Sequence, residues 1–456
     1  MFSSLNHSTL SYPIETSDRH LQAGNILVND PNRLLKQGIW IYFLLLIFEG
    51  ALRKWFLPSL ATPLLIVRDP LAIWLIIKVW QRGLLPANIY LAGIILIGIT
   101  GIFTATLLGH GSLPVALFGA RILLVHFPLM FVIGFIFSRE DVVKVGKITL
   151  WIAVPMTVLM ALQFYSPQSA WVNRGVGGDM EGAGFSGAMG YMRPPGTFSF
   201  TNGLTLFYSF VAAYVFYFWL HIKSINKLVL IGATLGLLAA IPLSISRSLF
   251  FSVGVTLIFT LIAVSHKPQY VSKVIVATFG LIIALVILSQ TSFFQTAIEV
   301  FTDRLENANK SEGGLGGVLL DRYLGGLLEA IVGSETENSP FFGYGLGMGT
   351  NVGSMLLTGD LKYLISEGEW GRLIGEMGPL MGIAVILLRL GFCAKITIAS
   401  YQKLISGDML PWILLSFCLL NVPQGQWAQP TALGFSTLIG GLMIASFHNP
   451  KEKFKN

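Results

Sequence analysis

Residues 87–108 read ANIYLAGIILIGITGIFTATLL, an apolar run without a single charged side chain. A helix needs about 20 apolar residues to cross the hydrocarbon core of a bilayer, which is roughly 30 Å thick. Lipid offers the backbone no hydrogen-bond partners, so a run of this kind crosses as a helix. Runs like it recur along the whole chain, and they predict an integral membrane protein.

The composition agrees with this prediction. Hydrophobic residues make up 54% of the 456 residues and charged residues only 12%, and the mean hydropathy is +0.70. A soluble domain carries about 25% charged residues, so this chain could not cover a surface in water. The two cysteines, Cys393 and Cys418, form no CxxC pair, and the sequence shows no metal-ligand cluster. We therefore expect no metal and no cofactor, and the net charge of +7 need not imply a nucleic acid partner.

The apolar runs predict an all-α polytopic protein with about twelve transmembrane helices. Glu49 interrupts the first run, and the pair Arg68-Asp69 interrupts the second. Asp69-Pro70 could equally start a helix, with Asp69 as the N-cap. The predicted spans are 38–52, 62–80, 87–108, 113–137, 145–165, 200–220, 226–245, 248–265, 271–290, 369–390, 408–422 and 429–447.

The lysines predict the orientation. Cytoplasmic loops carry an excess of lysine and arginine, and one side of this map holds most of the lysines. An even number of spans then places both termini in the cytoplasm. We expect a cytoplasmic tail over 1–37 without a signal peptide, a transmembrane domain over 38–447 and a second tail over 448–456. The lysines on this side are Lys36, Lys78, Lys144, Lys147, Lys223, Lys227, Lys267, Lys273, Lys395, Lys403, Lys451, Lys453 and Lys455.

The opposite side holds two larger segments, a glycine-rich one over about 166–199 and a longer one over about 291–368. Within the second, Phe293–Leu305 and Gly317–Val332 have the apolar spacing of helices that lie flat on a membrane surface. Loops of this length in a compact protein are usually functional.

On this outer side the basic residues are mostly arginine. A guanidinium grips phosphate oxygens with two parallel hydrogen bonds and stays charged in a protein. Each arginine alone could instead reach lipid phosphate or pair with a neighbouring acid, as in Asp303-Arg304 or Asp321-Arg322. As a set, their placement favours a site for an anionic headgroup such as pyrophosphate. The outer basic residues are Arg53, Arg68, Arg174, Arg193, Arg247, Arg304, Arg322, Arg372, Lys54, Lys310 and Lys362.

Two of these arginines stand at the ends of spans. Arg193 precedes Pro194-Pro195-Gly196, which predicts a rigid turn that holds the side chain over a helix mouth. Arg247 lies between two spans with almost no loop between them, so its charge stays near the hydrocarbon. An ionisable residue in that position indicates function.

The tenth predicted span begins with Glu369 and Arg372, which are spaced to pair with each other, and Glu376 follows one turn deeper. Before it, residues 340–349 read PFFGYGLGMG. These glycines would allow close backbone approach to a ligand, or they form an ordinary loop. The run is not a nucleotide-binding P-loop, because no Gly-Lys-Ser/Thr follows it.

Five short motifs, taken in order and by side, resemble those of the O-antigen ligase and O-antigen polymerase superfamily of membrane glycosyltransferases. The resemblance implies a GT-C-like bundle of helices with a large late outer loop. It also implies action on glycans carried by undecaprenyl pyrophosphate, at the outer face of the bacterial inner membrane and without a metal. The motifs are Arg193-Pro-Pro-Gly-Thr-Phe with Asn202, Ser246-Arg247-Ser248, Asp321-Arg322, Pro340-Phe-Phe-Gly-Tyr-Gly-Leu-Gly, and Glu369-Trp370-Gly371-Arg372 with Glu376.

On this resemblance Arg193 and Arg247 grip the pyrophosphate, with Arg322 as a further contact, and we add Arg372. The predicted reaction is an inverting transfer to a hydroxyl of an acceptor lipid-linked glycan. We predict Glu369, ahead of Glu367, as the proton acceptor. Outer aromatics such as Tyr344 and Trp370 could stack on sugars. The expected partners are therefore the lipid-linked donor, the acceptor glycan, the bilayer and other polysaccharide-assembly membrane proteins.

Histidine separates the alternatives within the family. The ligases carry a histidine in the late outer loop, and this chain has none between His266 and His448. This departure favours a polymerase over a ligase that joins glycan to lipid or protein. A secondary transporter of about twelve spans is the rival from another class, but its repeat symmetry and midplane charges are not seen here.

Overall fold

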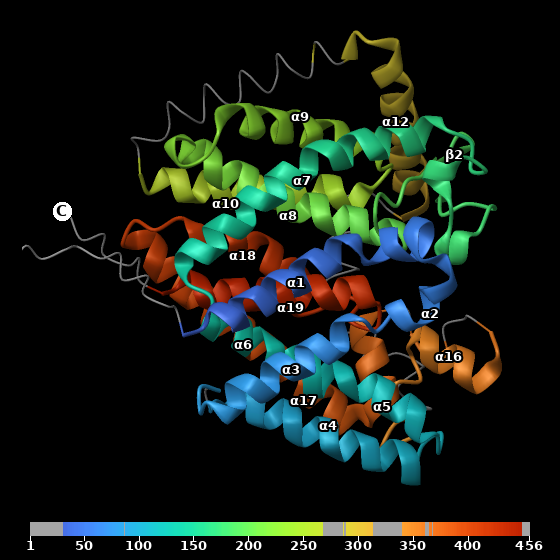
Figure 1. Ribbon diagram of the computed structural model, residues 1–456, viewed down its shortest axis with the longest axis vertical. Coiled ribbons are helices and arrows are strands. Elements are labelled where there is room, and N and C mark those ends of the chain that lie inside the picture. Colours follow the sequence, from blue (N-terminus) through green and yellow to red (C-terminus); the bar gives the residue numbers. More distant parts are fainter. Residues whose placement is uncertain are drawn as a thin grey trace, which may run out of the picture.

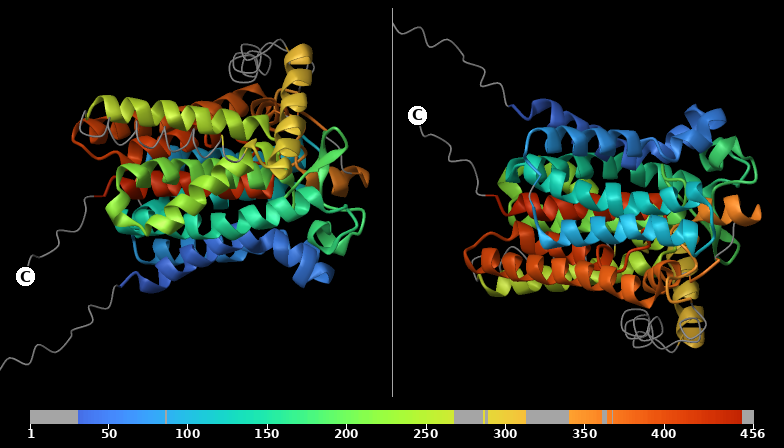
Figure 2. Two further views of the ribbon diagram at one scale, coloured as in Figure 1. Left: turned by 90° about the horizontal axis from the view of Figure 1, so that it is seen from above. Right: turned by 90° about the horizontal axis from the view of Figure 1, so that it is seen from below.

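The computed structural model of this chain is a bundle of long helices that run side by side along one axis (Figure 1, Figure 2). It describes residues 31–85, 87–267, 286, 289–312, 340–360, 364–366 and 368–448. The main helices are α1 (Arg33–Ala51), α3 (Arg68–Gln81), α4 (Ile89–Leu107), α5 (Leu113–Arg121), α6 (Phe127–Ile136), α7 (Arg139–Tyr165), α8 (Thr201–Leu220), α9 (Lys227–Leu243), α10 (Arg247–Ser265), α12 (Ser292–Glu312), α16 (Asn351–Thr358), α17 (Glu369–Ile405), α18 (Leu410–Asn421) and α19 (Pro430–Ser446).

Shorter elements join and cap these helices. The π-helical η1 (Leu52–Phe56) extends α1, and η3 (Ile122–His126) joins α5 to α6 into one long rod. Two strands form an antiparallel hairpin between α7 and α8, a small departure from a purely helical fold. The remaining short elements are η2 (Pro58–Leu60), α2 (Ala61–Leu64), η4 (Trp171–Asn173), η5 (Val176–Gly178), β1 (Phe185–Ala188), β2 (Tyr191–Arg193) and η6 (Ile222–Ser224).

The predicted, mostly helical architecture is confirmed. Within the described residues, eight helices are long and apolar enough to cross a membrane, and three shorter apolar helices, α9, α18 and α19, accompany them. These eight and three helices fall on eleven of the predicted spans. The predicted span 271–290 lies largely outside the described residues, and the predicted outer helix Gly317–Val332 lies wholly outside them.

Helix α8 is largely buried among its neighbours, and its aromatic side chains fill part of the core. Gly146 lets α7 approach this helix closely, because a Cβ at that position would meet the ring of Tyr214. The outer faces of the peripheral helices instead expose large apolar side chains, such as Leu96 on α4 and Leu228 on α9. That distribution suits lipid rather than water around the bundle. The buried aromatic residues of α8 are Phe207, Tyr208, Phe210, Tyr214, Tyr217 and Phe218.

The second predicted span is interrupted as the charged pair suggested. Helix α3 begins at Arg68, but the residue at its N-cap is Val67 and not Asp69. The Asp69 carboxylate instead pairs with Arg121 at 2.7 Å and with the His126 ring at 2.9 Å. The predicted helix start at this position is therefore confirmed, and the capping role of Asp69 is wrong.

The tenth predicted span is not one continuous helix. Gly378 has a φ of 75° and a ψ of 168°, which no helix allows, and Pro379 follows it. In a straight helix about 30 Å would separate residues 369 and 389. Here the Arg389 guanidinium lies 2.8 Å from the Glu369 carboxylate, so Glu369 to Met377 folds back along the next turns of α17. The α17 region remains long and apolar enough to span a membrane. The predicted bounds 369–390 are wrong, because a Gly-Pro pair reverses the chain inside them.

The two ends of the bundle differ. One end carries the β-hairpin, α12 and α16, and α12 lies across this end, roughly perpendicular to the long helices (Figure 1, Figure 2). We call it the hairpin end. The start of α1 and the end of α19 both lie at the opposite end, as an even number of crossings predicts. That the opposite end faces the cytoplasm stays a prediction.

Candidate functional site

The turn that follows Arg193 is clamped by side chains from two other helices. The Gln163 side chain of α7 bonds both the N–H and the carbonyl of Gly196, at 2.8 and 3.2 Å. The fully buried Lys54 donates to the same carbonyl at 2.6 Å. Gly196 has a φ of +61°, a value that favours glycine. The predicted rigid turn is therefore present, and it holds Arg193 at the end of β2.

A strained residue positions Arg247. Ile245 has a φ of 49° in the short connection between α9 and α10. A β-branched side chain rarely adopts this conformation, and residues of this kind cluster at functional sites. The side chain of the next residue, Ser246, accepts a hydrogen bond from the Leu249 N–H, so Arg247 stands at the first position of α10.

A third arginine joins these two from α12. The Arg304 guanidinium donates to the Gly187 carbonyl of the β-hairpin at 3.1 Å, and the rings of Phe301 and Phe250 pack α12 against α10 at 6.0 Å. Two separate contacts therefore place Arg304 beside the elements that carry Arg193 and Arg247. We call these three residues the arginine cluster. The sequence placed Arg304 among the outer arginines, with pairing to Asp303 as the alternative, but did not single it out as a pyrophosphate contact.

The cluster gathers positive charge that is only partly neutralised. Burial, and then the neighbouring charges of Arg304 and Arg247, lower the pKa of Arg193 from its ordinary value to about 10. Arg193 therefore remains cationic at neutral pH. Its Nε is buried without a hydrogen-bond partner, and among the described residues no carboxylate pairs with Arg193 or Arg304. An anion would relieve this arrangement.

An apolar groove on the side of the bundle reaches the elements of the cluster. Its volume is about 380 Å³, and α7, α9 and the start of α12 form its walls. Leu243 in this wall stands four residues before Arg247. Phe164, adjacent to the wall residue Tyr165, stacks on Tyr191 of β2 at 4.8 Å, two residues before Arg193. The lining residues are Thr157, Val158, Ala161, Leu162, Tyr165, Ser166, Ala239, Leu243, Thr291 and Phe294.

A second polar cluster lies in the folded-back part of α17. Arg372 donates to Glu369 at 2.8 and 3.1 Å and to Glu376 at 2.7 Å. Glu369 also accepts from Arg389 at 2.8 Å and from the Trp427 N–H at 3.1 Å. The pairing that the sequence allowed between Glu369 and Arg372 is confirmed, and it extends to two further charges.

These contacts bear on three predicted roles. Glu369 would have to release part of its network to accept a proton, and Arg372 would have to leave two carboxylates to grip a phosphate. Trp370 is only 8% exposed, and its indole N–H donates to the Pro423 carbonyl at 3.0 Å. Its geometry therefore favours packing over sugar stacking, whereas Tyr344 is 39% exposed. Arg322 and Glu367 lie outside the described residues.

The glycine-rich run 340–349 does allow close backbone approach, but to protein. Its N–H groups bind the folded-back part of α17: Tyr344 donates to the Gly375 carbonyl and Gly349 to the Glu376 carboxylate. Approach of this run to a ligand stays a prediction, and the contacts with α17 fix its reversal at the hairpin end.

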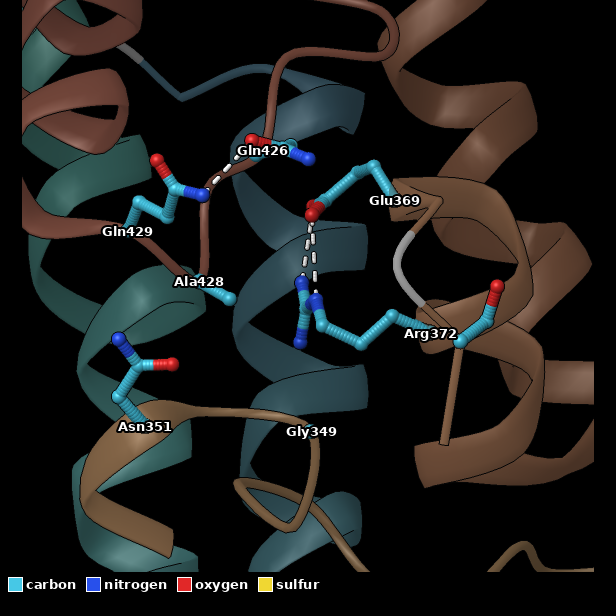
Figure 3. Close-up of a pocket in the computed structure, with 8 residues that line it drawn as sticks. Gly349, Asn351, Glu369, Arg372, Gln426, Ala428 and Gln429 are labelled. Carbon is cyan, nitrogen blue, oxygen red and sulfur yellow. Dashed lines mark hydrogen bonds and ion pairs between the residues drawn. The ribbon is translucent and has the colours of Figure 1, made fainter. Parts of the chain in front are cut away.

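A small polar pocket opens beside this second cluster (Figure 3). Glu369 and Arg372 line it from α17, Asn351 from α16, and Gln426 with Gln429 from the loop between α18 and α19. Figure 3 shows the paired Glu369 and Arg372 facing the two glutamine side chains across the pocket. The described part of the chain contains no group of three or more His, Cys, Asp or Glu side chains that could hold a metal ion.

Comparison of the chain with models of known protein families, with curated proteins and with solved structures finds no match.

Proposed function

We propose that this chain is a membrane glycosyltransferase that polymerises glycans at the hairpin end of the bundle. The donor is a glycan on undecaprenyl pyrophosphate, and the acceptor is a hydroxyl of a second lipid-linked glycan. We further propose that the hairpin end faces the outside of the bacterial inner membrane. The proposal rests on one observation: three arginines gather on elements that adjoin the walls of an apolar groove.

The arginine cluster suits the pyrophosphate of the donor, and the apolar groove suits its polyprenyl chain. A pyrophosphate carries negative charge and oxygen acceptors, which guanidinium groups bind with charge-assisted hydrogen bonds. A polyprenyl chain is apolar and resides in the bilayer, where a groove between α7 and α9 is open to it. Neither a free nucleotide nor a soluble sugar would need such a groove.

In the proposed reaction the acceptor oxygen attacks the anomeric carbon of the donor sugar. A new carbon–oxygen bond forms, the bond to the pyrophosphate oxygen breaks, and its electron pair leaves with the pyrophosphate. The arginine cluster stabilises the charge that develops there. The hydroxyl proton passes to a carboxylate, and this single displacement inverts the anomeric centre. Arg193, Arg247 and Arg304 carry the proposal, with Arg322 as a further predicted contact.

Binding of inorganic pyrophosphate to the full chain in lipid nanodiscs tests the site. We expect Arg193→Ala, Arg247→Ala and Arg304→Ala each to weaken binding about 10- to 100-fold, since a hydrogen bond to a charged group contributes about 1.5–3 kcal/mol. Binding should also weaken with added salt. The matched control is Arg82→Ala. Arg82 is exposed and donates to the carbonyl of Pro31, which lies just before α1.

The reaction is tested in the native host by the length of its surface glycans. Loss of a polymerase leaves single repeat units, loss of a ligase leaves long polymer on the carrier lipid, and loss of a transporter changes neither directly. If Arg247→Ala is inserted normally and leaves glycan length and yield unchanged, the proposed function is wrong.

A further inference from the structure

The small polar pocket of Figure 3 has a chemistry different from that of the arginine cluster. Its lining combines one ion pair with several uncharged polar side chains. The two glutamines bond each other at 2.8 Å, so the pocket wall is itself ordered. The lining residues are Gly349, Asn351, Ser366, Glu369, Arg372, Gln426, Ala428 and Gln429.

The charges in this region cancel. Glu369 and Glu376 offset Arg372 and Arg389, and all four side chains are buried. Among the described residues around the pocket, no excess charge remains to attract a phosphate or a cation. The amides of Asn351 and Gln426 both donate and accept hydrogen bonds. A neutral group that also donates and accepts is the complement of such a wall.

The volume of the pocket limits which neutral group can enter it. Its volume is about 20 Å³, which holds about one water molecule. A sugar hydroxyl is about as large as a water molecule. It can donate one hydrogen bond and accept two. A single hydroxyl can therefore enter while the sugar ring stays outside at the pocket mouth.

Polar contacts connect the pocket to the segment that carries Arg193. Gln429 bonds Gln426 on one side and accepts from the Asn202 amide on the other, at 3.2 Å. Asn202 stands in the first turn of α8, directly after the clamped turn, where Ser199 accepts from Arg53 at 2.9 Å. These contacts link the pocket to the chain segment that follows Arg193.

We propose that this pocket binds a non-reacting hydroxyl of the acceptor glycan and so selects the acceptor. This assignment rests on the proposed function, in which the arginine cluster holds the donor. The pocket recognises a neutral sugar, whereas the cluster recognises an anion. The two sites should therefore respond to different probes.

The test uses methyl glycosides of glucose, galactose and N-acetylglucosamine, measured by saturation-transfer NMR on the full chain in nanodiscs. We expect at least one of them to bind the wild-type protein. Gln426→Ala and Asn351→Ala should each weaken that binding up to about tenfold, since a neutral hydrogen bond contributes about 0.5–1.5 kcal/mol. Ala428→Leu should abolish it, because the larger side chain fills the pocket and leaves every polar group in place.

Pyrophosphate binding to the same variants separates the two proposals. The three pocket variants should bind it as the wild type does. Arg247→Ala should bind it about 10- to 100-fold more weakly while keeping the sugar. Gln402→Ala, an exposed amide near the far end of α17, is the control. Unchanged sugar binding in Ala428→Leu, or no sugar binding in the wild type, would overturn the pocket assignment. If the wild-type protein binds no pyrophosphate, the proposed function fails and the acceptor role fails with it.

Discussion

The carboxylate of Glu369 accepts four hydrogen bonds in a fully buried position. Arg389, one of its partners, is also buried, and its guanidinium stacks on the Trp427 ring at 4.0 Å. Removing one member of a buried ion pair leaves the other charge without compensation, which costs more than the pair itself contributes. At the scale of single residues, the folded-back part of α17 is therefore held by charge.

We predict that Glu369→Gln lowers the free energy of unfolding by about 3–5 kcal/mol, because Arg372 and Arg389 then share too little negative charge. Denaturation of the protein in detergent measures this. Adding Arg389→Met to Glu369→Gln should recover part of the loss. If the double variant is less stable than the sum of the two single changes, the charge argument fails.

The clamp on Gly196 gives a second prediction at this scale. Gln163→Leu removes the bonds to both the N–H and the carbonyl of Gly196, and the carbonyl of Val172 also loses a donor. The Gly196 carbonyl keeps its bond from Lys54, whereas the Gly196 N–H loses the bond to Gln163. Each buried polar group left without a partner costs about 1–3 kcal/mol. We expect lower stability and weaker pyrophosphate binding together, since Arg193 depends on this turn. Unchanged binding in a folded variant would show that the turn does not position Arg193.

At the scale of elements, reversal of the chain at Gly378 shapes the polar pocket. A Cβ there would meet the Phe341 carbonyl oxygen, and the φ of +75° already disfavours any side chain. We predict that Gly378→Ala lowers the free energy of unfolding by about 1–3 kcal/mol and reduces sugar binding. Gly391→Ala is the matched control, because it lies in the same helix and its Cβ would only touch the Tyr90 ring at 3.4 Å.

Helix α1 packs against the turn after Arg193 through Gly50. A Cβ at this position would clash with the backbone of residues 197–199. Gly50→Ala should therefore displace the turn and weaken pyrophosphate binding severalfold. Gly254→Ala on α10 should be neutral, since its Cβ would meet open space. Equal pyrophosphate binding by the two variants would contradict this account.

Several features of these elements could be predicted from the sequence. Apolar run length found the helices because each helix must satisfy its own backbone in lipid. Arg193 stood out because it lies just before a span, and Arg247 because it lies between two spans with almost no loop. The dipeptide Gly378-Pro379 was also a readable turn signal, and hydropathy averaged over the span concealed it.

Other features depend on contacts between distant parts of the chain. The sequence offers Arg304 the adjacent Asp303, yet Arg304 bonds Gly187, which only the docking of α12 on the hairpin brings near. Burial of Trp370 likewise follows from the reversal at Gly378 and not from its neighbours in sequence. Local pattern cannot supply such contacts, because they arise when the elements pack.

At the scale of the whole molecule, the polar clusters share one end of the bundle. The two cysteines, Cys393 and Cys418, are buried, so an introduced cysteine can report which side that end faces. We predict that a membrane-impermeant maleimide labels Met180→Cys in intact spheroplasts and Lys144→Cys only after lysis. Both positions are well exposed, at 63% of the residue and of the side chain respectively. The reverse pattern would invert the orientation and with it the proposed reaction.

If the groove between α7 and α9 takes its ligand from the bilayer, occupancy depends on the surface density of that ligand in the membrane. A ligand that arrives sideways, from within the leaflet, is counted per area of bilayer and not per volume of water. Diluting in buffer vesicles that contain the protein and its lipid-linked ligand would leave the occupancy of the groove unchanged. Adding inert lipid to the vesicles would lower that occupancy. The number of ligand molecules per area of membrane then sets the supply of ligand to the groove.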